Sequence, residues 1–394
     1  MTGDPSDPSA SVRGPAAGTF VSFAPGRVNL IGEHIDYHGL PVLPMALERG
    51  VRVRFTPRND HRIALENAEA EFGPREFGMS ADLSPGTPGD WGNYARAAAV
   101  TAREVFGCRF GIEGTVSSDL PPAAGLSSSS ALMVALCQAL LHADGRRVPP
   151  LVLAEAAAEG ERFVGTAGGG MDQAASLLGK AGHALRIGFD PLTARPVPMP
   201  PSWRVVVAHT GVRAEKSGGA QEAYNLRRSE TTRGLEWLGR RLGEPGARPV
   251  ELLARHSLDR LRSAAGEIEE PGASWVRHIV EEAIRVEEAV SSLEAADLAR
   301  FGTLLSASHA SLRDLYQVSH PRLDTLVEAA LEAGAAGARL TGAGFGGCML
   351  AVCREDRVGS VSEGLAAAQA GFSPTPELAP FEAFPGPGAS VRKG

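Results

Sequence analysis

The sequence predicts a two-domain protein built from both α-helices and β-strands. Its 394 residues exceed the ~100–200 residues of a typical domain, which indicates two domains. Short strand patterns and helical patterns alternate in the first half, whereas long helical patterns dominate the second half. A proline-rich stretch over residues 191–201 lies between two predicted strands and is the candidate boundary.

This boundary and two expected tails divide the chain into four parts. Residues 1–18 are rich in proline and serine and are expected to form a disordered tail. The first domain would cover residues 19–200, and the second domain would cover residues 201–384. Residues 385–394 are expected to form a second tail.

The composition limits the class of protein. A hydrophobic content of 43% and a charged content of 22% are typical of soluble globular proteins. The net charge of -7 argues against general binding to nucleic acids or anionic membranes. No apolar run approaches the ~20 residues of a membrane-spanning helix, and the N-terminus lacks the pattern of a signal peptide. We therefore expect a cytoplasmic protein whose four cysteines are reduced thiols in the core.

The pattern of apolar residues predicts the elements in order. In the first half, strands are expected at residues 20–23, 51–55, 63–65, 111–117 and 182–187, and helices at residues 91–106, 132–141 and 151–164. The strand at 63–65 is expected to pair with the strand at 51–55. In the second half, strands are expected at residues 203–208, 337–341 and 348–352, and helices at residues 223–242, 252–265, 274–293, 296–311 and 323–333.

The stretch at residues 120–141 organises the rest of the chain. Its first half, with Pro-Pro-Ala-Ala-Gly-Leu-Ser-Ser-Ser-Ser, cannot be helical, and the Ala- and Leu-rich run that follows is a good helix. A loop of small residues that leads into a helix aims free N–H groups and the positive end of the helix dipole at one point. This predicts a nucleotide phosphate site, although a serine-capped helix explains the pattern equally well. The loop is not a Walker A loop, because the chain has no Gly-x-x-x-x-Gly-Lys-Ser/Thr motif.

Two further segments carry charged residues beside glycines. Arg27, Glu33, His34 and Asp36 lie between apolar flanks and need partners, which a polyhydroxylated ligand or a solvated loop with an internal ion pair would provide. Asp172 follows Gly-Thr-Ala-Gly-Gly-Gly-Met. An aspartate in this position is most often a helix N-cap, and a catalytic base at the start of a helix would show the same pattern.

Residues 342–347, Gly-Ala-Gly-Phe-Gly-Gly, formally match the Gly-x-Gly-x-x-Gly pattern of dinucleotide sites. Such a site requires a helix directly after the glycines. The sequence Cys-Met-Leu-Ala-Val that follows predicts a strand instead. A glycine-rich turn between two strands, approached closely by ligand or backbone, therefore fits better.

Together these segments resemble the motifs of the GHMP small-molecule kinases. Residues 26–37 (the first motif), Gly-Arg-Val-Asn-Leu-Ile-Gly-Glu-His-Ile-Asp-Tyr, resemble the galactokinase signature. Residues 122–131 (the serine motif) resemble the phosphate-binding motif of the family, and residues 340–348 (the third motif) resemble its third motif. The chain is identified as a member of this family, and the resemblance runs from residue 24 to residue 352.

The resemblance implies a fold and an activity. The fold would be α+β, with a ribosomal-protein-S5-like N-terminal domain, a ferredoxin-like C-terminal domain and the active site in the cleft between them. The reaction would move the γ-phosphoryl group of ATP to the anomeric hydroxyl of a hexose, with Mg²⁺ as cofactor. The expected partner is a small-molecule sugar, and the protein is expected to be a monomer.

The resemblance also implies roles for individual residues. Asp172 would take the proton from the sugar hydroxyl, with Arg27 beside it. Sugar hydroxyls would be bound by Glu33, His34, Asp36, Tyr224 and the backbone of Gly169. The residues expected to contact the nucleotide are Ala124, Gly125, Leu126, Ser127, Ser128, Ser129, Ser130 and Gly344. Ser129 and Glu161 would bind Mg²⁺, with Glu159 as the competing ligand.

Three sugars remain candidates at this point. Galactose is first, because Tyr224 resembles the tyrosine of the galactokinases. N-acetylgalactosamine is second, because the four serines, the Gly-Gly-Gly-Met-Asp turn and the Ile-Asp-Tyr-x-Gly sequence resemble N-acetylgalactosamine kinases and fungal galactokinases. Another sugar with an axial C4 hydroxyl is third. A non-catalytic sugar sensor is the alternative from another class, but such sensors are altered in the serine motif, which is complete here.

Overall fold

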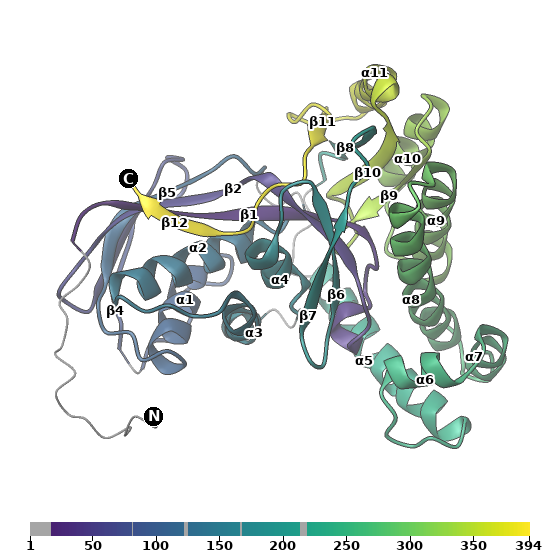
Figure 1. Cartoon of the computed structure of the whole chain (residues 1–394), viewed down its shortest axis with the longest axis horizontal. Coiled ribbons are helices and arrows are strands. Elements are labelled where there is room, and N and C mark those ends of the chain that lie inside the picture. The colour runs from purple at the N-terminus through teal and green to yellow at the C-terminus, as the bar shows by residue number, and fades with distance from the viewer. Residues whose placement is uncertain (1–16, 81, 122–124, 166–167, 213–218) are drawn as a thin grey trace.

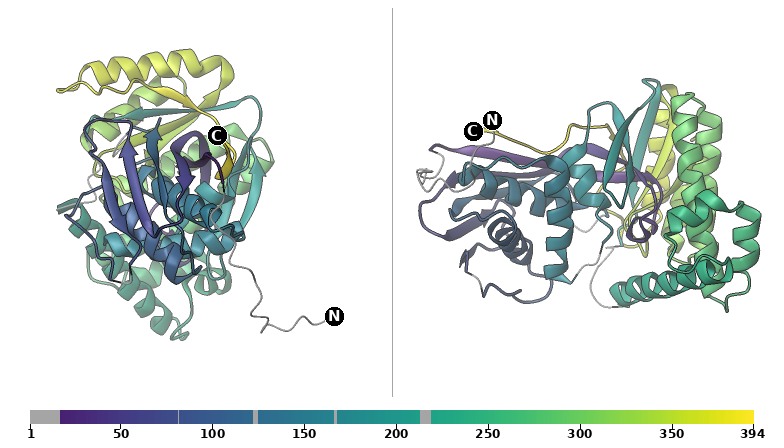
Figure 2. Two further views of the ribbon diagram at one scale, coloured as in Figure 1. Left: turned by 90° about the vertical axis from the view of Figure 1, so that its left-hand side faces the viewer. Right: turned by 60° about the horizontal axis from the view of Figure 1, so that its bottom comes forward.

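The computed structural model describes residues 17–80, 82–121, 125–165, 168–212 and 219–394. These residues form an N-terminal part around a long sheet and a C-terminal part dominated by helices, which lie side by side (Figures 1 and 2). The expected N-terminal tail at residues 1–18 lies almost entirely outside the described residues.

A six-stranded sheet forms the frame of the N-terminal part. Its strand order is β12-β1-β2-β5-β3-β4, where β12 is Ser390–Lys393, with β3 and β5 parallel and the other neighbours antiparallel. The first five strands are β1 (Phe20–Ile31), β2 (Leu43–Pro57), β3 (Arg62–Asn67), β4 (Arg75–Gly78) and β5 (Ile112–Ser118). The expected pairing of residues 63–65 with residues 51–55 is wrong, because β5 lies between β2 and β3.

Strand β1 is longer than its sequence pattern predicts. The prediction ended this strand before Pro25, whereas the structure continues it to Ile31. The register against β2 shifts between Pro25 and Arg27, and this irregularity accommodates a proline that cannot donate a hydrogen bond. As a result, Arg27 projects from a sheet strand and not from a loop.

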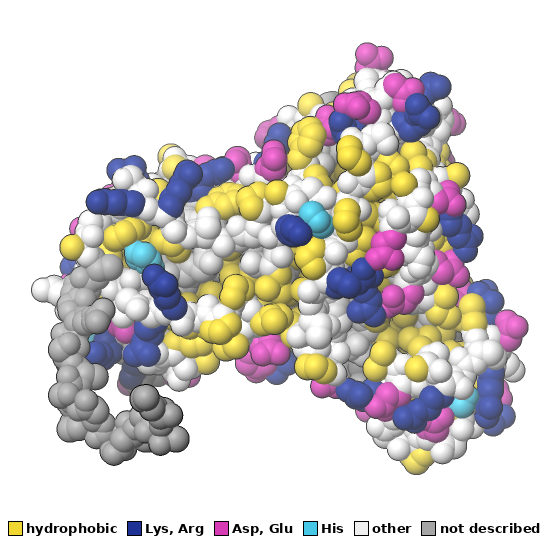
Figure 3. Space-filling model, viewed as in Figure 1, with side chains coloured by type: hydrophobic (Ala, Val, Ile, Leu, Met, Phe, Trp, Pro, Cys, Tyr) yellow, Lys and Arg dark blue, Asp and Glu magenta, His cyan; other side chains and the backbone are white. Residues whose placement is uncertain are grey.

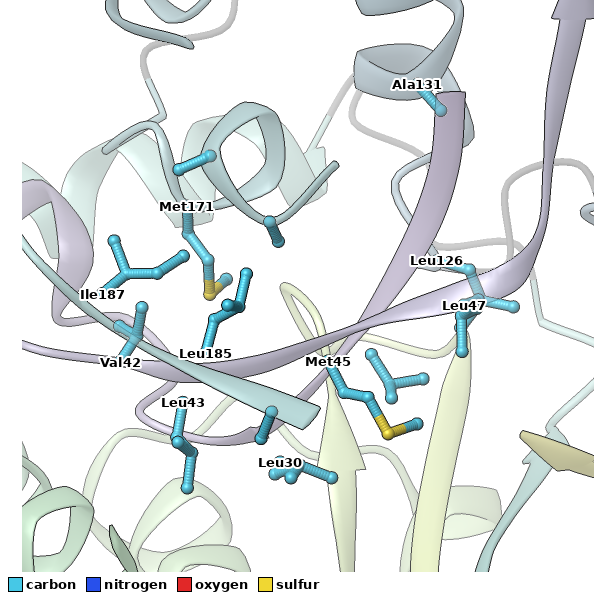
Figure 4. Packing of buried hydrophobic residues seen from close by; sticks show 14 of the residues in the cluster. Leu30, Val42, Leu43, Met45, Leu47, Leu126, Ala131, Met171, Leu185 and Ile187 are labelled. Atoms are coloured by element: carbon cyan, nitrogen blue, oxygen red, sulfur yellow. The ribbon is translucent and has the colours of Figure 1, made fainter. Parts of the chain in front are cut away.

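Among the described residues, four helices cover one face of this sheet (Figure 1). They are α1 (Gly92–Glu104), α2 (Ser128–Ala143), α3 (Pro150–Gly160) and α4 (Met171–Leu178). Figure 4 shows Leu126 beside Leu47, and Met171 near Leu185 and Ile187. The residues that adjoin Gly125 and Asp172 in the sequence are therefore anchored in the hydrophobic core.

The proline-rich stretch is not a simple linker. Its residues form β7 (Thr193–Pro198), which pairs with β6 (His183–Gly188) in a hairpin. Arg186 and Arg195 of this hairpin pair with Glu287 and Glu294 of the C-terminal part. Figure 3 shows basic and acidic side chains side by side over this junction.

The second sheet has the order β11-β8-β10-β9, and all its neighbours are antiparallel. Its strands are β8 (Trp203–His209), β9 (Gly337–Thr341), β10 (Cys348–Arg354) and β11 (Phe381–Ala383). Helices connect β8 to β9, and α11 (Val358–Ala370) connects β10 to β11, so the chain follows the β-α-β-β-α-β path of a ferredoxin-like domain. The predicted glycine-rich turn between two strands is confirmed, because residues 342–347 join β9 to β10.

In the part of this segment that the structure describes, six helices lie between β8 and β9. They are α5 (Gly219–Arg241), α6 (Pro249–Arg255), α7 (Leu258–Ala265), α8 (Gly272–Glu294), α9 (Leu298–Ala310) and α10 (Pro321–Glu332). The single helix predicted over residues 252–265 is two helices, because Ser257 caps the start of α7 with its side chain. A π-helical turn, Ser311–Leu315, follows α9.

The end of the chain corrects another expectation. Residues 385–394 were expected to form a tail, but Ser390–Lys393 form strand β12, which pairs with β1. The N–H of Gly388 also donates to the carbonyl of Gly179 at 2.7 Å. The chain therefore returns from the second sheet to cover the free edge of the first.

All four cysteines are buried free thiols, as predicted. Among the described residues, no helix is long and apolar enough to cross a membrane.

Candidate active site

The three motifs, which lie far apart in the sequence, meet between the two sheets. A Cβ atom added at Gly342 of the third motif would lie 3.1 Å from the carbonyl oxygen of Gly125 in the serine motif. The hydroxyl of Thr341 hydrogen-bonds the N–H and the C=O of Asn29 in the first motif, at 3.0 and 3.2 Å. The fold thus places all three motifs around one point.

Helix α2 begins at this point without a side-chain cap. Ser127 precedes the helix with a left-handed φ of 59°, and its side chain makes no cap hydrogen bond. Its hydroxyl is buried and has no hydrogen-bond partner among the described residues. The alternative of a serine-capped helix is therefore not observed, and the first N–H groups of α2 remain available to an anion.

Arg27 and Asp172 form a buried ion pair beside this helix start. Nε and Nη2 of Arg27 lie 2.8 and 2.7 Å from Oδ1 of Asp172. Nη1 of Arg27 donates to the carbonyl of Gly125 at 2.7 Å. The two side chains are 6% and 15% exposed, so the pair is largely shielded while the carboxylate keeps a small exposed surface. One guanidinium therefore connects β1, α4 and the serine motif.

Asp36 occupies the N-terminal end of α4. Its carboxylate accepts hydrogen bonds from the N–H of Gly169, at 3.1 Å, and from the N–H of Met171. Burial raises the pKa of Asp36 from its ordinary 3.8 to about 6, and the carboxylates of Asp172 and Glu33 act in the same direction. The helix N-terminus thus holds two carboxylates close together.

Glu33 joins the first motif to the third motif. Its carboxylate accepts from the N–H of Gly342 and from the side-chain amide of Asn29, both at 2.5 Å. The residue is 2% exposed, and burial raises its pKa, whereas Arg339 and Arg27 oppose the rise. Its expected contact with a sugar would therefore use lone pairs that remain beside these two bonds.

Buried charges of the C-terminal part hold the backbone of the first motif. Glu282 of α8 accepts from the N–H of Gly32 at 2.9 Å. Arg339 of β9 is fully buried and donates to the carbonyls of Asn29 and Leu30 at 3.1 and 3.0 Å. Burial alone would raise the pKa of Glu282, but nearby cations, with Arg285 first, lower it to about 2. The carboxylate is therefore ionised in its cationic surroundings.

His34 already has a protein partner at each ring nitrogen. Nε2 lies 3.1 Å from the carbonyl oxygen of Ala343, and Nδ1 lies 3.0 Å from the hydroxyl of Tyr37. Its backbone has a left-handed φ of 63°. Both ring nitrogens of His34 are therefore engaged by the protein, and its expected contact with a sugar stays a prediction.

Tyr224 of α5 lies against the first motif. Its ring centroid is 5.5 Å from that of His34 and 5.6 Å from that of Tyr37. Burial raises the pKa of Tyr224 well above its ordinary value, and the neighbouring carboxylate of Asp36 adds to this. The hydroxyl therefore remains a hydrogen-bond donor at neutral pH.

The structure distinguishes the two glutamates proposed as metal ligands. Glu161 is 4% exposed and accepts from Ser130 at 2.8 Å and from Gln173 at 2.7 Å. The side chain of Glu159 is 67% exposed and pairs with Arg162. Ser129 is the partly exposed neighbour of Ser130 in the first turn of α2. Glu161 is thus the glutamate that faces the serine motif.

The remaining expected contacts are divided between backbone and side chain. Leu126 and Ser130 have buried side chains, one in the core and one bonded to Glu161, so only their backbones could reach a nucleotide. Gly344 packs closely against Val318, since a Cβ atom at Gly344 would lie 2.2 Å from the carbonyl oxygen of Val318. Ser128 lies in the first turn of α2 and is partly exposed. Ala124 lies outside the described residues.

Sequence reasoning missed the residues of the C-terminal part that contact the first motif. Glu282, His278, Tyr316 and Arg339 contact the first motif from α8, β9 and the end of α9. One signal was present in the sequence, because Arg339 is a lone charge within an apolar strand. A lone buried charge needs partners, which could have been sought.

Comparisons with known proteins agree with this geometry. The galactokinase galactose-binding signature matches residues 12–57, the GHMP kinases N terminal domain matches residues 93–180, and the GHMP kinases C terminal domain matches residues 289–370. A galactokinase of Roseiflexus sp. (strain RS-1) is 39% identical over 347 residues, which are 88% of this chain and 86% of that protein.

Solved structures show the same similarity. The galactokinase of Lactococcus lactis, complexed with galactose, superposes with a TM-score of 0.85 and 30% identity over 94% of this chain and 95% of that chain. The mevalonate kinase of L. major shares the fold at 19% identity, with a TM-score of 0.64 over 96% of this chain and 99% of that chain. The chain therefore belongs to the galactokinase family of the GHMP kinases.

Proposed function

We propose that this protein transfers the γ-phosphoryl group of ATP to the anomeric hydroxyl of galactose, giving α-galactose 1-phosphate and ADP. The observation that carries the proposal is the Arg27–Asp172 pair at the point where the three motifs meet. Family membership supports it, since a galactokinase shares 39% of aligned residues and a 30% identical structure holds galactose.

In the proposed reaction Asp172 accepts the proton of the anomeric hydroxyl, and the oxygen of that hydroxyl attacks the γ-phosphorus. The bond between the γ-phosphorus and the oxygen that bridges to the β-phosphorus breaks, and ADP leaves. Arg27 stabilises the ionised carboxylate and the charge on the transferred group. Phosphoryl transfer depends mainly on positioning and charge neutralisation, which this pre-formed pair provides.

The sugar is proposed to lie between α4 and α5. Asp36 and Glu33 would offer acceptors to its hydroxyls, and Tyr224 would offer a donor. Gly169 shapes the floor, because a Cβ atom there would lie 2.4 Å from the backbone of Asp36. His34 completes the pocket through its ring, which the protein holds in place.

The phosphates of ATP are proposed to lie at the start of α2. The backbone N–H groups from Gly125 to Ser129 would bind them, and the glycines around Gly344 would let the third motif approach the nucleotide. The oxygen donors Ser129 and Glu161 fit a Mg²⁺ ion, which prefers oxygen ligands together with phosphates. When bound, Mg²⁺ would neutralise charge on the phosphate oxygens.

An ADP-release assay over a panel of free sugars tests the proposal. The panel contains galactose, N-acetylgalactosamine, glucose and a further sugar with an axial C4 hydroxyl. Galactose is expected to give the highest kcat/KM, with ³¹P NMR showing the phosphate on C1. A higher kcat/KM for N-acetylgalactosamine would make that sugar the substrate in place of galactose. ATP binding without turnover on any sugar would indicate a sensor.

Glu161→Gln is expected to raise the Mg²⁺ concentration for half-maximal velocity by about tenfold, because a neutral amide is a weaker ligand than a carboxylate. Ser129→Ala is expected to act in the same direction. A magnesium titration at saturating ATP and sugar measures the effect. Glu159→Gln is the matched control, since this glutamate is exposed, and an effect of that variant alone would move the metal site to Glu159.

The KM for the sugar is expected to rise as the pH falls through about 6, since this is the pKa of Asp36. Below that pH the carboxyl group is protonated and loses its role as a charged acceptor for a sugar hydroxyl. Steady-state kinetics between pH 5 and 8 measure this. Asp36→Asn removes the titrating group, so a pH profile with the same inflection in that variant would contradict the assignment.

Two further expectations also remain proposals. A monomeric state can be measured by light scattering in solution. A cytoplasmic location can be measured by cell fractionation.

A further inference from the structure

Tyr316 lies in an irregular piece of backbone next to the first motif. It follows the π-helical turn Ser311–Leu315 at the end of α9, and Gln317 after it has a left-handed φ of 58°. Single π-helical turns and left-handed non-glycine residues are costly and occur frequently at functional sites. The side chain of Tyr316 is fully buried, so this backbone places its ring inside the protein.

The ring of Tyr316 packs between His34 of the first motif and His278, which contacts that motif. Its centroid lies 4.8 Å from that of His34 and 4.7 Å from that of His278. Nε2 of His278 lies 3.2 Å from the carbonyl oxygen of Glu33, and Nδ1 lies 2.8 Å from the hydroxyl of Ser311. The π-helical turn therefore leads directly into Tyr316, and its Ser311 also contacts His278.

The hydroxyl of Tyr316, which also hydrogen-bonds Thr231, belongs to a chain of hydrogen bonds that leads through Tyr37 and whose directions can be assigned. The carbonyl of Ala343 can only accept, so Nε2 of His34 carries the proton and donates to it. Burial and the neighbouring His278 lower the pKa of His34 to about 3, so the ring is neutral and Nδ1 accepts from Tyr37. The hydroxyl of Tyr316 then donates to the oxygen of Tyr37 at 2.9 Å.

The same backbone segment supports the third motif from the other side. The carbonyl of Val318 accepts from the N–H of Phe345 at 2.7 Å. The carbonyls of Tyr316 and Gln317 accept from the guanidinium of Arg227, at 2.8 and 2.9 Å. This guanidinium lies over the ring of Phe345, at 5.4 Å from its centroid. The residues 316–318 thus contact α5, the first motif and the third motif together.

We propose that Tyr316 is a positioning residue for the sugar site, whose hydroxyl acts through Tyr37 to orient the ring of His34 against Ala343. This joins the first motif, which would bind the sugar, to the third motif, which would cover the nucleotide. The inference rests on the proposed sugar kinase activity. It assigns to Tyr316 no contact with the substrate itself.

Tyr316→Phe tests the proposal, because it retains the ring that packs between the two histidines and removes only the hydroxyl. The KM for galactose is expected to rise about 3- to 10-fold, the loss expected for one intramolecular hydrogen bond. The kcat value is expected to stay within about twofold of the wild-type value, because Arg27 and Asp172 keep their contacts. An unchanged KM, with or without a lower melting temperature, would overturn the proposal.

A double-mutant cycle provides the sharper measurement. Tyr37→Phe is expected to raise the KM as well, and the double variant is expected to be no worse than the more impaired single variant, because the two hydroxyls belong to one chain. Additive effects on KM would show that the hydroxyls act independently and would contradict the chain. Ser22→Ala is the matched control, since it removes a buried hydroxyl that bonds the carbonyl of Ala135 away from the site.

Failure of this inference can be separated from failure of the proposed function. The wild-type protein is assayed first, and absence of galactose turnover would refute the function. An active wild-type protein with an unchanged KM in Tyr316→Phe would overturn only the role of Tyr316.

Discussion

Asp172→Asn is expected to lower kcat for galactose phosphorylation by about a hundredfold or more, the range in which general bases contribute. Asparagine has nearly the shape of aspartate, but it cannot accept a proton at neutral pH. It also carries no charge to pair with Arg27, whose two nitrogens now lie 2.8 and 2.7 Å from one carboxylate oxygen. Steady-state kinetics with ATP and galactose at saturating Mg²⁺ measure the change.

The size of the effect decides how much proton abstraction matters in this reaction. In a fully loose transition state a base contributes little beyond positioning, whereas a tighter one gives it the hundredfold contribution expected above. A kcat within a few-fold of the wild-type value would therefore remove Asp172 from the role of base. Asp60→Asn is the matched control, because Asp60 also pairs with an arginine, Arg58, but on a partly exposed edge away from the three motifs. It is expected to leave kcat unchanged.

Arg27→Lys is expected to lower kcat by about a hundredfold, although the positive charge is retained. The planar guanidinium serves Asp172 with two nitrogens and the carbonyl of Gly125 with a third. A lysine ammonium is a single point on a flexible stem and cannot reproduce this fork. The variant would therefore lose both the alignment of the base and the fixed charge beside the transferred group.

The changes in kcat and KM of Arg27→Lys show whether Arg27 acts mainly in the transition state. If Arg27 acts mainly in the transition state, kcat and kcat/KM fall together while the KM for galactose changes little. Full activity in Arg27→Lys would show that charge alone suffices and that the fork is dispensable. Arg58→Lys is the control, because Arg58 makes a similar fork to Asp60 on the surface.

Most elements of the fold could be predicted from local sequence. The Ala- and Leu-rich run of α2 and the alternating residues of β2 follow from periodicity, because a single helix or strand needs only its own side-chain pattern to be recognised. The predictions failed where a distant partner decides the structure. β12 forms because β1 offers it a free edge, and β7 forms because β6 pairs with it, although proline-rich sequences around both strands predict loops.

Several residues of the candidate site could also be predicted from the sequence. Arg27, Asp36, Asp172 and Glu161 could be proposed from motifs, because each lies beside glycines or serines that resemble a family pattern. Their contacts could not be proposed. His34 was expected to contact a sugar, but its contacts with Tyr37 and Ala343 could not be read from the sequence.

The sequence by itself determined the family, the three motifs and the residues that would perform the chemistry. Only the tertiary structure decided how those residues are held, because a buried charge or a buried hydroxyl must find a partner wherever the fold brings one. Glu282, Arg339 and Tyr316 lie some 250 to 310 residues from the first motif, and no local pattern joins them to it. Their hydrogen bonds to that motif are the part of the active site that folding alone creates.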